Sequence, residues 1–110
     1  MKKRVEEVRI GKSLLGIGQP TFIVAEMSAN HCGKLERALE IVRSVKRSGA
    51  DAIKLQTYTA DSITLKCDRD DFRIPSASPW GNYSTLWELY DEAFTPWEWH
   101  AEIFNEARKL

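Results

Sequence analysis

The chain has 110 residues, of which 43% are hydrophobic and 10% aromatic, so it can bury the core of one small domain. Its 16 basic and 16 acidic side chains cancel, which gives no reason to expect nucleic acid or an anionic membrane as a partner. No apolar run is as long as a membrane span and no signal peptide opens the chain, so we expect a cytoplasmic protein with Cys32 and Cys67 as free thiols.

Three short apolar runs near the start of the chain predict β-strands. Residues 8–10 and 14–17 are separated by polar turn residues and predict a hairpin within a lead-in over residues 1–20. The third run, residues 22–26, predicts a buried strand that ends on the carboxylate of Glu26.

Residues 34–49 predict a helix, because apolar side chains recur at spacings of three and four and Gly49 follows as a stop. The apolar positions are Leu35, Ala38, Leu39, Val42 and Val45. Residues 51–57 then predict a second strand. Residues 21–57 therefore form a βαβ unit, whose crossover requires parallel strands, and the predicted fold class is α/β.

The remainder of the chain divides into a loop and helices. Residues 58–83 lack apolar periodicity and predict a long loop of the kind that is typical of functional segments. Residues 84–110 predict two helices, the second with Thr95 as N-cap, Pro96 at the first helical position and Glu98 as capping-box partner. The predicted core or interface anchors are Trp80, Trp87, Trp97 and Trp99.

The predicted sheet is too small to be complete. Two parallel strands would leave both sheet edges exposed, and the helical pattern is still running where the chain ends at Leu110. A closed (β/α)8 barrel takes about 250 residues. We therefore expect residues 1–110 to be the N-terminal segment of a TIM-barrel domain that is incomplete in this chain.

Polar side chains mark the carboxyl ends of the two predicted parallel strands. Ala52, Lys54 and Gln56 share one face of the second strand by period-two geometry. In such sheets ligands bind beyond the carboxyl ends of the strands, where Glu26 ends the neighbouring strand. Lys54 is a point charge suited to a phosphate or a carboxylate. A structural Lys54–Glu26 ion pair explains the same pattern equally well.

The turn after Glu26 supplies further candidates. Ser28, Asn30 and His31 can reach into a pocket there, or Ser28 and Asn30 can cap the following helix. For His31 a structural role is favoured over a metal site, since no second ligand stands at helical spacing. From the residues alone, the pattern indicates an anion-binding α/β enzyme fragment.

These residues resemble the start of the sialic acid synthase family. The shared motifs are Ala25-Glu26, Asn30-His31-Cys32-Gly33 and Lys54-Leu55-Gln56-Thr57. Within the family, the stretches "DDFRI" and "LWELYDEAFTPWEWHAEIF" are most similar to the pseudaminic acid branch. The resemblance covers nearly all of the chain from Val8 onward.

The resemblance implies a metal-dependent transferase of carbohydrate biosynthesis. The expected reaction condenses phosphoenolpyruvate with an open-chain N-acylated amino sugar to give a nonulosonic acid and phosphate. In the pseudaminic branch that sugar is a 2,4-diacetamido-2,4,6-trideoxy hexose. A divalent metal, manganese or magnesium, orients the sugar aldehyde in this family, and its ligands are expected outside this segment.

The resemblance also implies roles for five residues. Lys54 and Gln56 are expected to bind phosphoenolpyruvate, with Lys54 offsetting negative charge. Glu26 is expected to orient Lys54 or a substrate hydroxyl, which makes Glu26 and Lys54 the catalytic candidates. Asn30 and His31 are further substrate-binding candidates. The full-length protein is expected to be a homodimer, and this segment is expected to be inactive alone.

Two alternatives stay open at this point. One keeps the chemistry and changes the sugar, which gives an N-acetylneuraminate or legionaminate synthase fragment. The other is a non-catalytic α/β module that binds a partner through its unclosed sheet edge and its tryptophan-rich helices.

Overall fold

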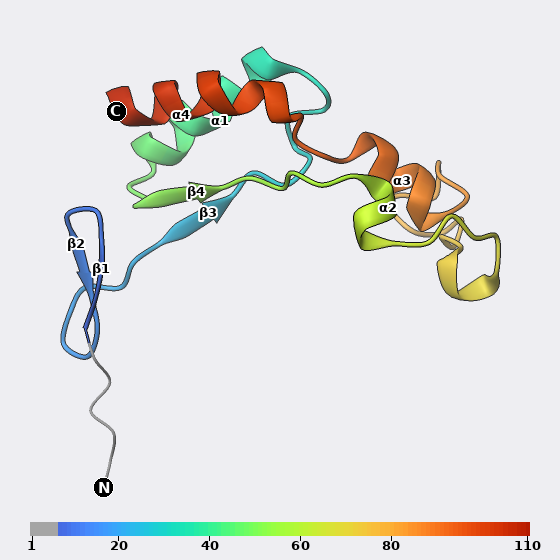
Figure 1. Ribbon diagram of the computed structural model, residues 1–110, viewed down its shortest axis with the longest axis horizontal. Coiled ribbons are helices and arrows are strands. Elements are labelled where there is room, and N and C mark those ends of the chain that lie inside the picture. Colours follow the sequence, from blue (N-terminus) through green and yellow to red (C-terminus); the bar gives the residue numbers. More distant parts are fainter. Residues whose placement is uncertain (1–6) are drawn as a thin grey trace, which may run out of the picture.

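An antiparallel hairpin opens the structure, a computed structural model that describes residues 7–110. The first six residues of the predicted lead-in lie outside the described residues. β1 (Val8–Ile10) pairs with β2 (Ser13–Leu15), and Gly11 makes the turn at a φ of 57°, a left-handed conformation that suits glycine. The hairpin is confirmed, although β2 ends two residues earlier than predicted. It lies apart from the helices in Figure 1.

The next three elements form the predicted βαβ unit. β3 (Val24–Glu26), α1 (Leu35–Arg47) and β4 (Ala52–Lys54) follow in order, and the two strands pair in parallel. The α/β class and the parallel crossover are therefore confirmed. Both strands are shorter than predicted: β3 begins two residues later and ends at Glu26 as predicted, whereas β4 begins one residue later and ends three residues earlier, at Lys54.

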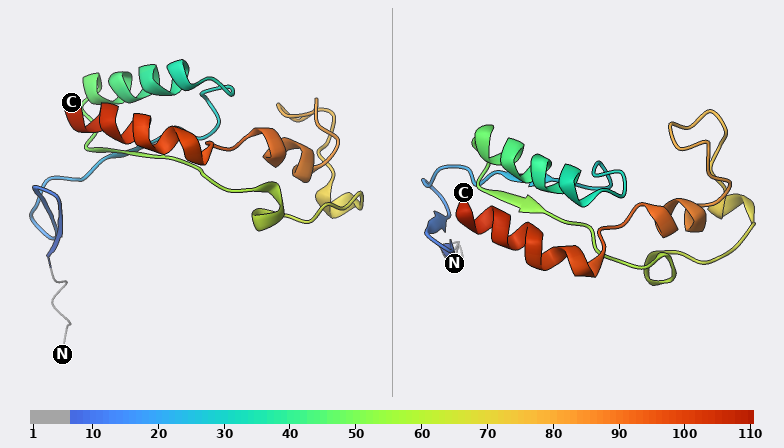
Figure 2. Two further views of the ribbon diagram at one scale, coloured as in Figure 1. Left: turned by 45° about the horizontal axis from the view of Figure 1, so that its top comes forward. Right: turned by 90° about the horizontal axis from the view of Figure 1, so that it is seen from above.

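The hydrophobic core lies between these strands and two helices. α1 packs against α4 (His100–Lys109), and Figure 2 shows both helices on one side of β3 and β4. The buried members of the core are Met27, Ala38, Val42 and Ile103. Arg43 and Glu106 join the two helices through an ion pair of 2.6 Å.

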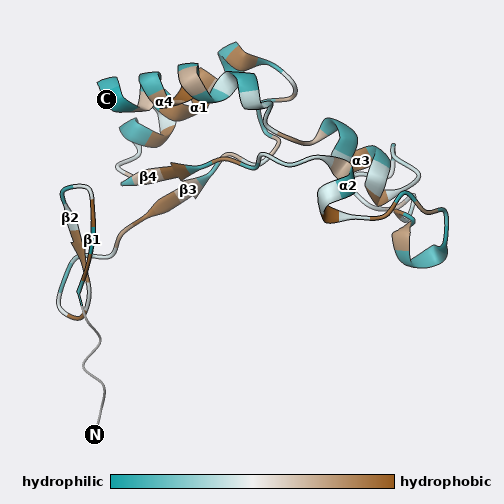
Figure 3. Ribbon diagram, viewed as in Figure 1, coloured by the Kyte–Doolittle hydropathy of each residue, from teal (hydrophilic) through white to brown (hydrophobic). Residues whose placement is uncertain are grey.

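The opposite face of the two strands is uncovered within residues 7–110. Val24, which shares the face of Glu26, is about half exposed there, at 47%. The apolar colouring of β3 in Figure 3 marks this stretch. Two strands alone are marginally stable in water, so the packing of α1 and α4 must hold this small sheet together.

The region after β4 contains more regular structure than the predicted loop. Within residues 58–83 the chain forms α2 (Ala60–Ile63) and the 3-10 turn η1 (Asp70–Phe72). α3 (Leu86–Glu92) follows and begins with a capping box, in which the Thr85 hydroxyl accepts from the Glu88 N–H at 3.3 Å. Among residues 7–110, no helix has the length and apolar character needed to cross a membrane.

The predicted start of the last helix is wrong. Pro96 is the N-cap of the 3-10 turn η2 (Trp97–Trp99), and α4 begins only at His100. Thr95 is fully buried and does not cap, because its hydroxyl faces His31 Nε2 at 3.5 Å; its backbone N–H donates to the Gln56 carbonyl at 2.7 Å. The residues before the last helix are therefore held by a contact with Gln56, just past β4, rather than by a local capping pattern.

The last helix presents an apolar face to the core. Ile103 is buried, and Trp99 and Ala107 pack against the same core. Trp99 is thus a core anchor, whereas Trp80 and Trp97 are exposed at 57% and 70%. An interface role for these two exposed rings stays a prediction.

Candidate functional site

Glu26 and Lys54 lie side by side where β3 and β4 end. They are register partners in the parallel ladder, so their side chains leave the same face of the sheet. The Lys54 ammonium forms an ion pair with the Glu26 carboxylate, and the two side chains remain 52% and 57% exposed. The ion pair that the sequence offered as a structural alternative is therefore present.

The exposure of this pair limits its value for stability. Exposed ion pairs contribute about 0–1 kcal/mol, because solvent screens the charges and two long side chains lose conformational freedom. An anionic ligand can therefore displace Glu26 from the ammonium at little cost to the fold. The ion pair is compatible with a binding role, since it holds a cation in place on an open face.

β4 and the residues after it present polar and apolar side chains to opposite sides, as the period-two pattern predicts. Ile53 and Leu55 pack against the core, whereas Lys54 and Gln56 are exposed. With Glu26 from the neighbouring strand, the exposed side carries a carboxylate, an ammonium and an amide. This set can bind an anion and accept a hydrogen bond from a hydroxyl group.

The turn after β3 does not cap α1 through Ser28 or Asn30. Lys34 is the N-cap of α1, and its side chain makes no capping hydrogen bond. Asn30 instead donates from Nδ2 to the Met27 carbonyl at 2.9 Å, which closes the turn on itself. Asn30 is exposed near the end of β3, and its substrate-binding role stays a prediction.

The His31 ring is buried, with 1% of the residue exposed. Its Nδ1 accepts the Gly33 N–H at 3.1 Å, so the ring proton lies on Nε2, which faces the Thr95 hydroxyl at 3.5 Å. The ring also meets Trp99 edge to face, with 5.2 Å between centroids. These contacts are structural, and a ligand role for His31 stays a prediction.

Burial lowers the pKa of His31 from its ordinary value of 6.5, because desolvation disfavours the charged ring. The unfolded chain then binds more protons than the folded chain at a pH between the two pKa values. The contribution of His31 to stability is therefore complete above about pH 6.5 and is lost as the pH falls through the folded-state pKa.

We expect the variant His31→Gln to lack this contribution, since an amide does not titrate in this range. Urea midpoints of both proteins, measured at several pH values from neutral to acidic, test the expectation. Carboxylates titrate in both proteins, so the difference between the two curves isolates His31. A difference that does not change with pH would contradict a neutral, buried ring.

Two contacts that the sequence did not predict hold the chain just past β4. The Thr95 N–H donates to the Gln56 carbonyl at 2.7 Å, and the Thr57 hydroxyl lies 2.6 Å from His100 Nε2. Thr57 and His100 are 43 residues apart in the chain, so no local sequence pattern signals their pairing.

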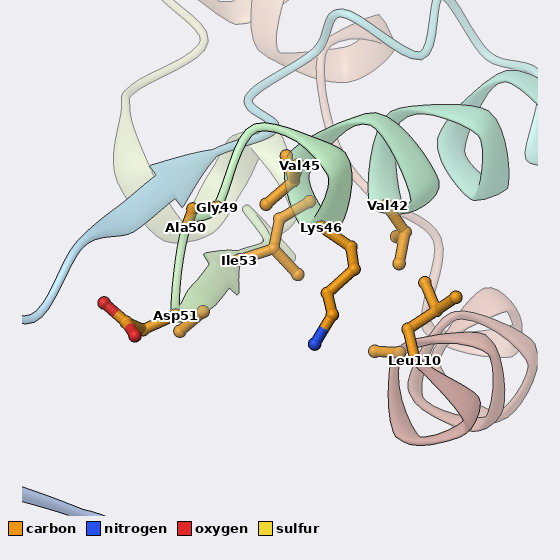
Figure 4. Close-up of a pocket in the computed structure, with 10 residues that line it drawn as sticks. Val42, Val45, Lys46, Gly49, Ala50, Asp51, Ile53 and Leu110 are labelled. Atoms are coloured by element: carbon orange, nitrogen blue, oxygen red, sulfur yellow. The ribbon is translucent and has the colours of Figure 1, made fainter.

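The cleft in Figure 4 lies at the amino end of β4, away from Lys54. It has a volume of about 340 Å³ between the last turn of α1, the start of β4 and the end of α4. Its lining includes Val42, Lys46, Asp51, Ile53 and Leu110. Because ligands of parallel sheets bind at the carboxyl ends of the strands, the Glu26–Lys54 end is the stronger candidate site.

Comparison with known proteins relates the chain to sugar acid synthases. A model of the NeuB family matches residues 41–110. The pseudaminic acid synthase of Campylobacter jejuni is 53% identical over 87 residues, which are 79% of this chain and 25% of that protein. The pseudaminic acid synthase of Helicobacter pylori is 51% identical over 92 residues, which are 84% of this chain and 26% of that protein.

A solved structure shows the same fold. The crystal structure of the spore coat polysaccharide biosynthesis protein SpsE from Bacillus subtilis superposes with a TM-score of 0.64 at 28% sequence identity. The match covers 94% of this chain and 25% of that protein. The chain thus spans about a quarter of the length of the relatives that it matches.

Proposed function

Because the chain belongs to the NeuB family, we propose that it forms the opening segment of a nonulosonic acid synthase, and that the product is pseudaminic acid. The proposed substrates are phosphoenolpyruvate and a 2,4-diacetamido-2,4,6-trideoxy hexose. The identity of more than half of the aligned residues with two pseudaminic acid synthases supports this choice of sugar.

The main observation in support of the proposed substrate site is the exposed Glu26–Lys54 pair at the carboxyl ends of two parallel strands. Phosphoenolpyruvate carries a phosphate and a carboxylate, and Lys54 would offset part of that charge. The Gln56 amide would donate a directional hydrogen bond to the same substrate. Once the ammonium engages the substrate, the Glu26 carboxylate can accept from a sugar hydroxyl.

The proposed reaction forms one carbon–carbon bond and one carbon–oxygen bond from water, and it breaks the carbon–oxygen bond to phosphate. The enol carbon of phosphoenolpyruvate attacks the aldehyde carbon of the open-chain sugar, and the aldehyde oxygen gains a proton. Water adds to the cation that remains at C2 and loses a proton, and departure of phosphate leaves the 2-keto acid. Preorganised charge such as that of Lys54 favours these steps most where water is excluded.

In the whole protein, water would be excluded from Lys54 if the open face of the sheet were covered. We propose that β3 and β4 are the first two strands of a (β/α)8 barrel, in which the face that carries Lys54 turns toward the interior. The 94% coverage of this chain by the match to the B. subtilis protein supports a shared architecture. We further propose a cytoplasmic homodimer for the full-length protein.

We propose that the whole enzyme uses a divalent ion, manganese or magnesium. Within residues 7–110, no three His, Cys, Asp or Glu side chains gather closely enough to hold a metal ion. These residues therefore do not fit a metal site, and the roles given to Glu26, Lys54 and Gln56 do not depend on one.

Product analysis with the full-length protein tests the proposal. We expect phosphate release from phosphoenolpyruvate in the presence of the 2,4-diacetamido sugar, and a nonulosonic acid of the corresponding mass. N-acetylmannosamine and the legionaminic precursor serve as competing acceptors. Turnover of N-acetylmannosamine alone would exclude pseudaminic acid as the product. Absence of phosphate release with every sugar would exclude a synthase.

A further inference from the structure

The polar end of β4 extends past its partner strand. The β3–β4 ladder ends at Glu26 and Lys54, and one more backbone bond joins the Met27 N–H to the Lys54 carbonyl at 3.0 Å. Gln56 and Thr57 follow that last bond, so pairing with β3 does not fix them. A side chain that donates a directional hydrogen bond to a substrate must nevertheless be held within about 0.5 Å of its productive position.

The segment from Thr95 to His100, the first residue of α4, supplies the missing contacts. The Thr95 N–H donates to the Gln56 carbonyl at 2.7 Å, and His100 Nε2 lies 2.6 Å from the hydroxyl of Thr57, the next residue. Two neighbouring residues after β4 are thus held by two residues of one short segment. We refer to Thr95 and His100 together as the brace.

Packing holds both residues of the brace in place. Thr95 is fully buried, and its hydroxyl faces His31. The His100 ring lies next to Trp97 and Phe104, with centroid separations of 4.8 and 5.4 Å. Because their surroundings restrict both side chains, the brace is preorganised and needs little ordering when a ligand arrives.

We propose that Thr95 and His100 are positioning residues that set the place of Gln56 for phosphoenolpyruvate. The inference rests on the proposed function, because Gln56 has this importance only as a ligand of that substrate. Neither residue of the brace needs to touch the substrate, since both act on the backbone or on the neighbouring side chain. Their loss should therefore weaken the binding of phosphoenolpyruvate more than that of the sugar.

The variant His100→Phe is the first test in the full-length protein. Phenylalanine keeps an aromatic ring between Trp97 and Phe104 and removes the hydrogen bond to Thr57. We expect the KM for phosphoenolpyruvate to rise about fivefold to tenfold, while kcat and the KM for the sugar change less than about twofold. His100→Gln restores a side-chain amide that can donate to or accept from the Thr57 hydroxyl, and it should recover most of the wild-type KM.

A second pair of variants tests the other half of the brace. The Thr95 contact with Gln56 is made by the backbone N–H, which Thr95→Val retains. Thr95→Val removes the hydroxyl that faces His31 and helps to hold Thr95 in place, whereas Thr95→Ser retains that hydroxyl. We expect Thr95→Val to raise the KM for phosphoenolpyruvate, because the Thr95 N–H is then held less firmly against the Gln56 carbonyl, and Thr95→Ser to restore it. Thr85→Val is the matched control, because it removes a threonine hydroxyl that caps α3 rather than one that faces His31.

The outcomes separate this inference from the proposed function. A purely structural loss lowers the fraction of active protein, so it reduces the apparent kcat and leaves both KM values unchanged. If His100→Phe and Thr95→Val behave like Thr85→Val in an active synthase, the positioning inference is wrong and the proposed function stands. If the wild-type protein consumes no phosphoenolpyruvate with any amino sugar, the proposed function is wrong, and the inference that rests on it is wrong too.

Discussion

Replacing Lys54 with methionine is expected to lower kcat/KM for phosphoenolpyruvate by about a hundredfold or more in the full-length protein. Methionine keeps an unbranched side chain and removes the charge. The attraction between two opposite unit charges about 4 Å apart near a protein surface is about 4 kcal/mol. Removal of one ammonium group can therefore account for a loss of this size. Glu26 would also be left facing the anionic substrate, and its repulsion adds to the effect.

Two further variants make the Lys54 result specific. Lys46→Met makes the same substitution on the last turn of α1, away from the carboxyl ends of the strands, and should leave kcat/KM unchanged. Adding Glu26→Gln to Lys54→Met removes the unpaired carboxylate and should recover part of the lost activity. Stability should change by no more than about 1 kcal/mol in either Lys54 variant, because the ion pair is exposed. A kcat/KM close to that of the wild type would show that Lys54 does not bind phosphoenolpyruvate.

The βαβ unit could be predicted because its signals are local. Apolar spacing of three and four, with Gly49 as a stop, specifies α1, and alternation separates Lys54 from Ile53 and Leu55. Parallel pairing then follows from the crossover, and it sets Glu26 opposite Lys54. Which ligand these side chains bind does not follow from alternation, and that part of the proposal depends on the family.

The start of the last helix could not be predicted because a distant contact outweighs a local one. Thr95, Pro96 and Glu98 match a helix-start pattern, and an N-cap contributes about 1 kcal/mol. The Thr95 hydroxyl that would cap faces His31 instead, 64 residues away in the chain. The buried Thr95 N–H donates to the Gln56 carbonyl, and leaving such an N–H unpaired would cost about 1–3 kcal/mol. The position of His31 beside the Thr95 hydroxyl likewise brings together residues that are far apart in the chain, which local patterns do not predict.

Replacing Ile103 with alanine is expected to destabilise the protein by about 2–5 kcal/mol. Ile103 has no exposed surface and belongs to the core cluster with Met27, Ala38 and Val42. Removing its outer atoms leaves a cavity where α4 packs against α1, and a close-packed interior refills such a space only in part. The urea midpoint of the full-length protein, with an unchanged m-value, measures the loss.

Ile17→Ala is the matched control, since it removes the same atoms from a side chain that is 83% exposed. Its effect should stay within about 0.5 kcal/mol, because no cavity forms and little apolar surface returns to water. Equal effects of the two variants would contradict the docking of α4 on α1. The packing of α4 on α1 also places Thr95 and His100 next to the residues that follow β4. Ile103→Ala should therefore weaken the contacts of the brace as well as the core.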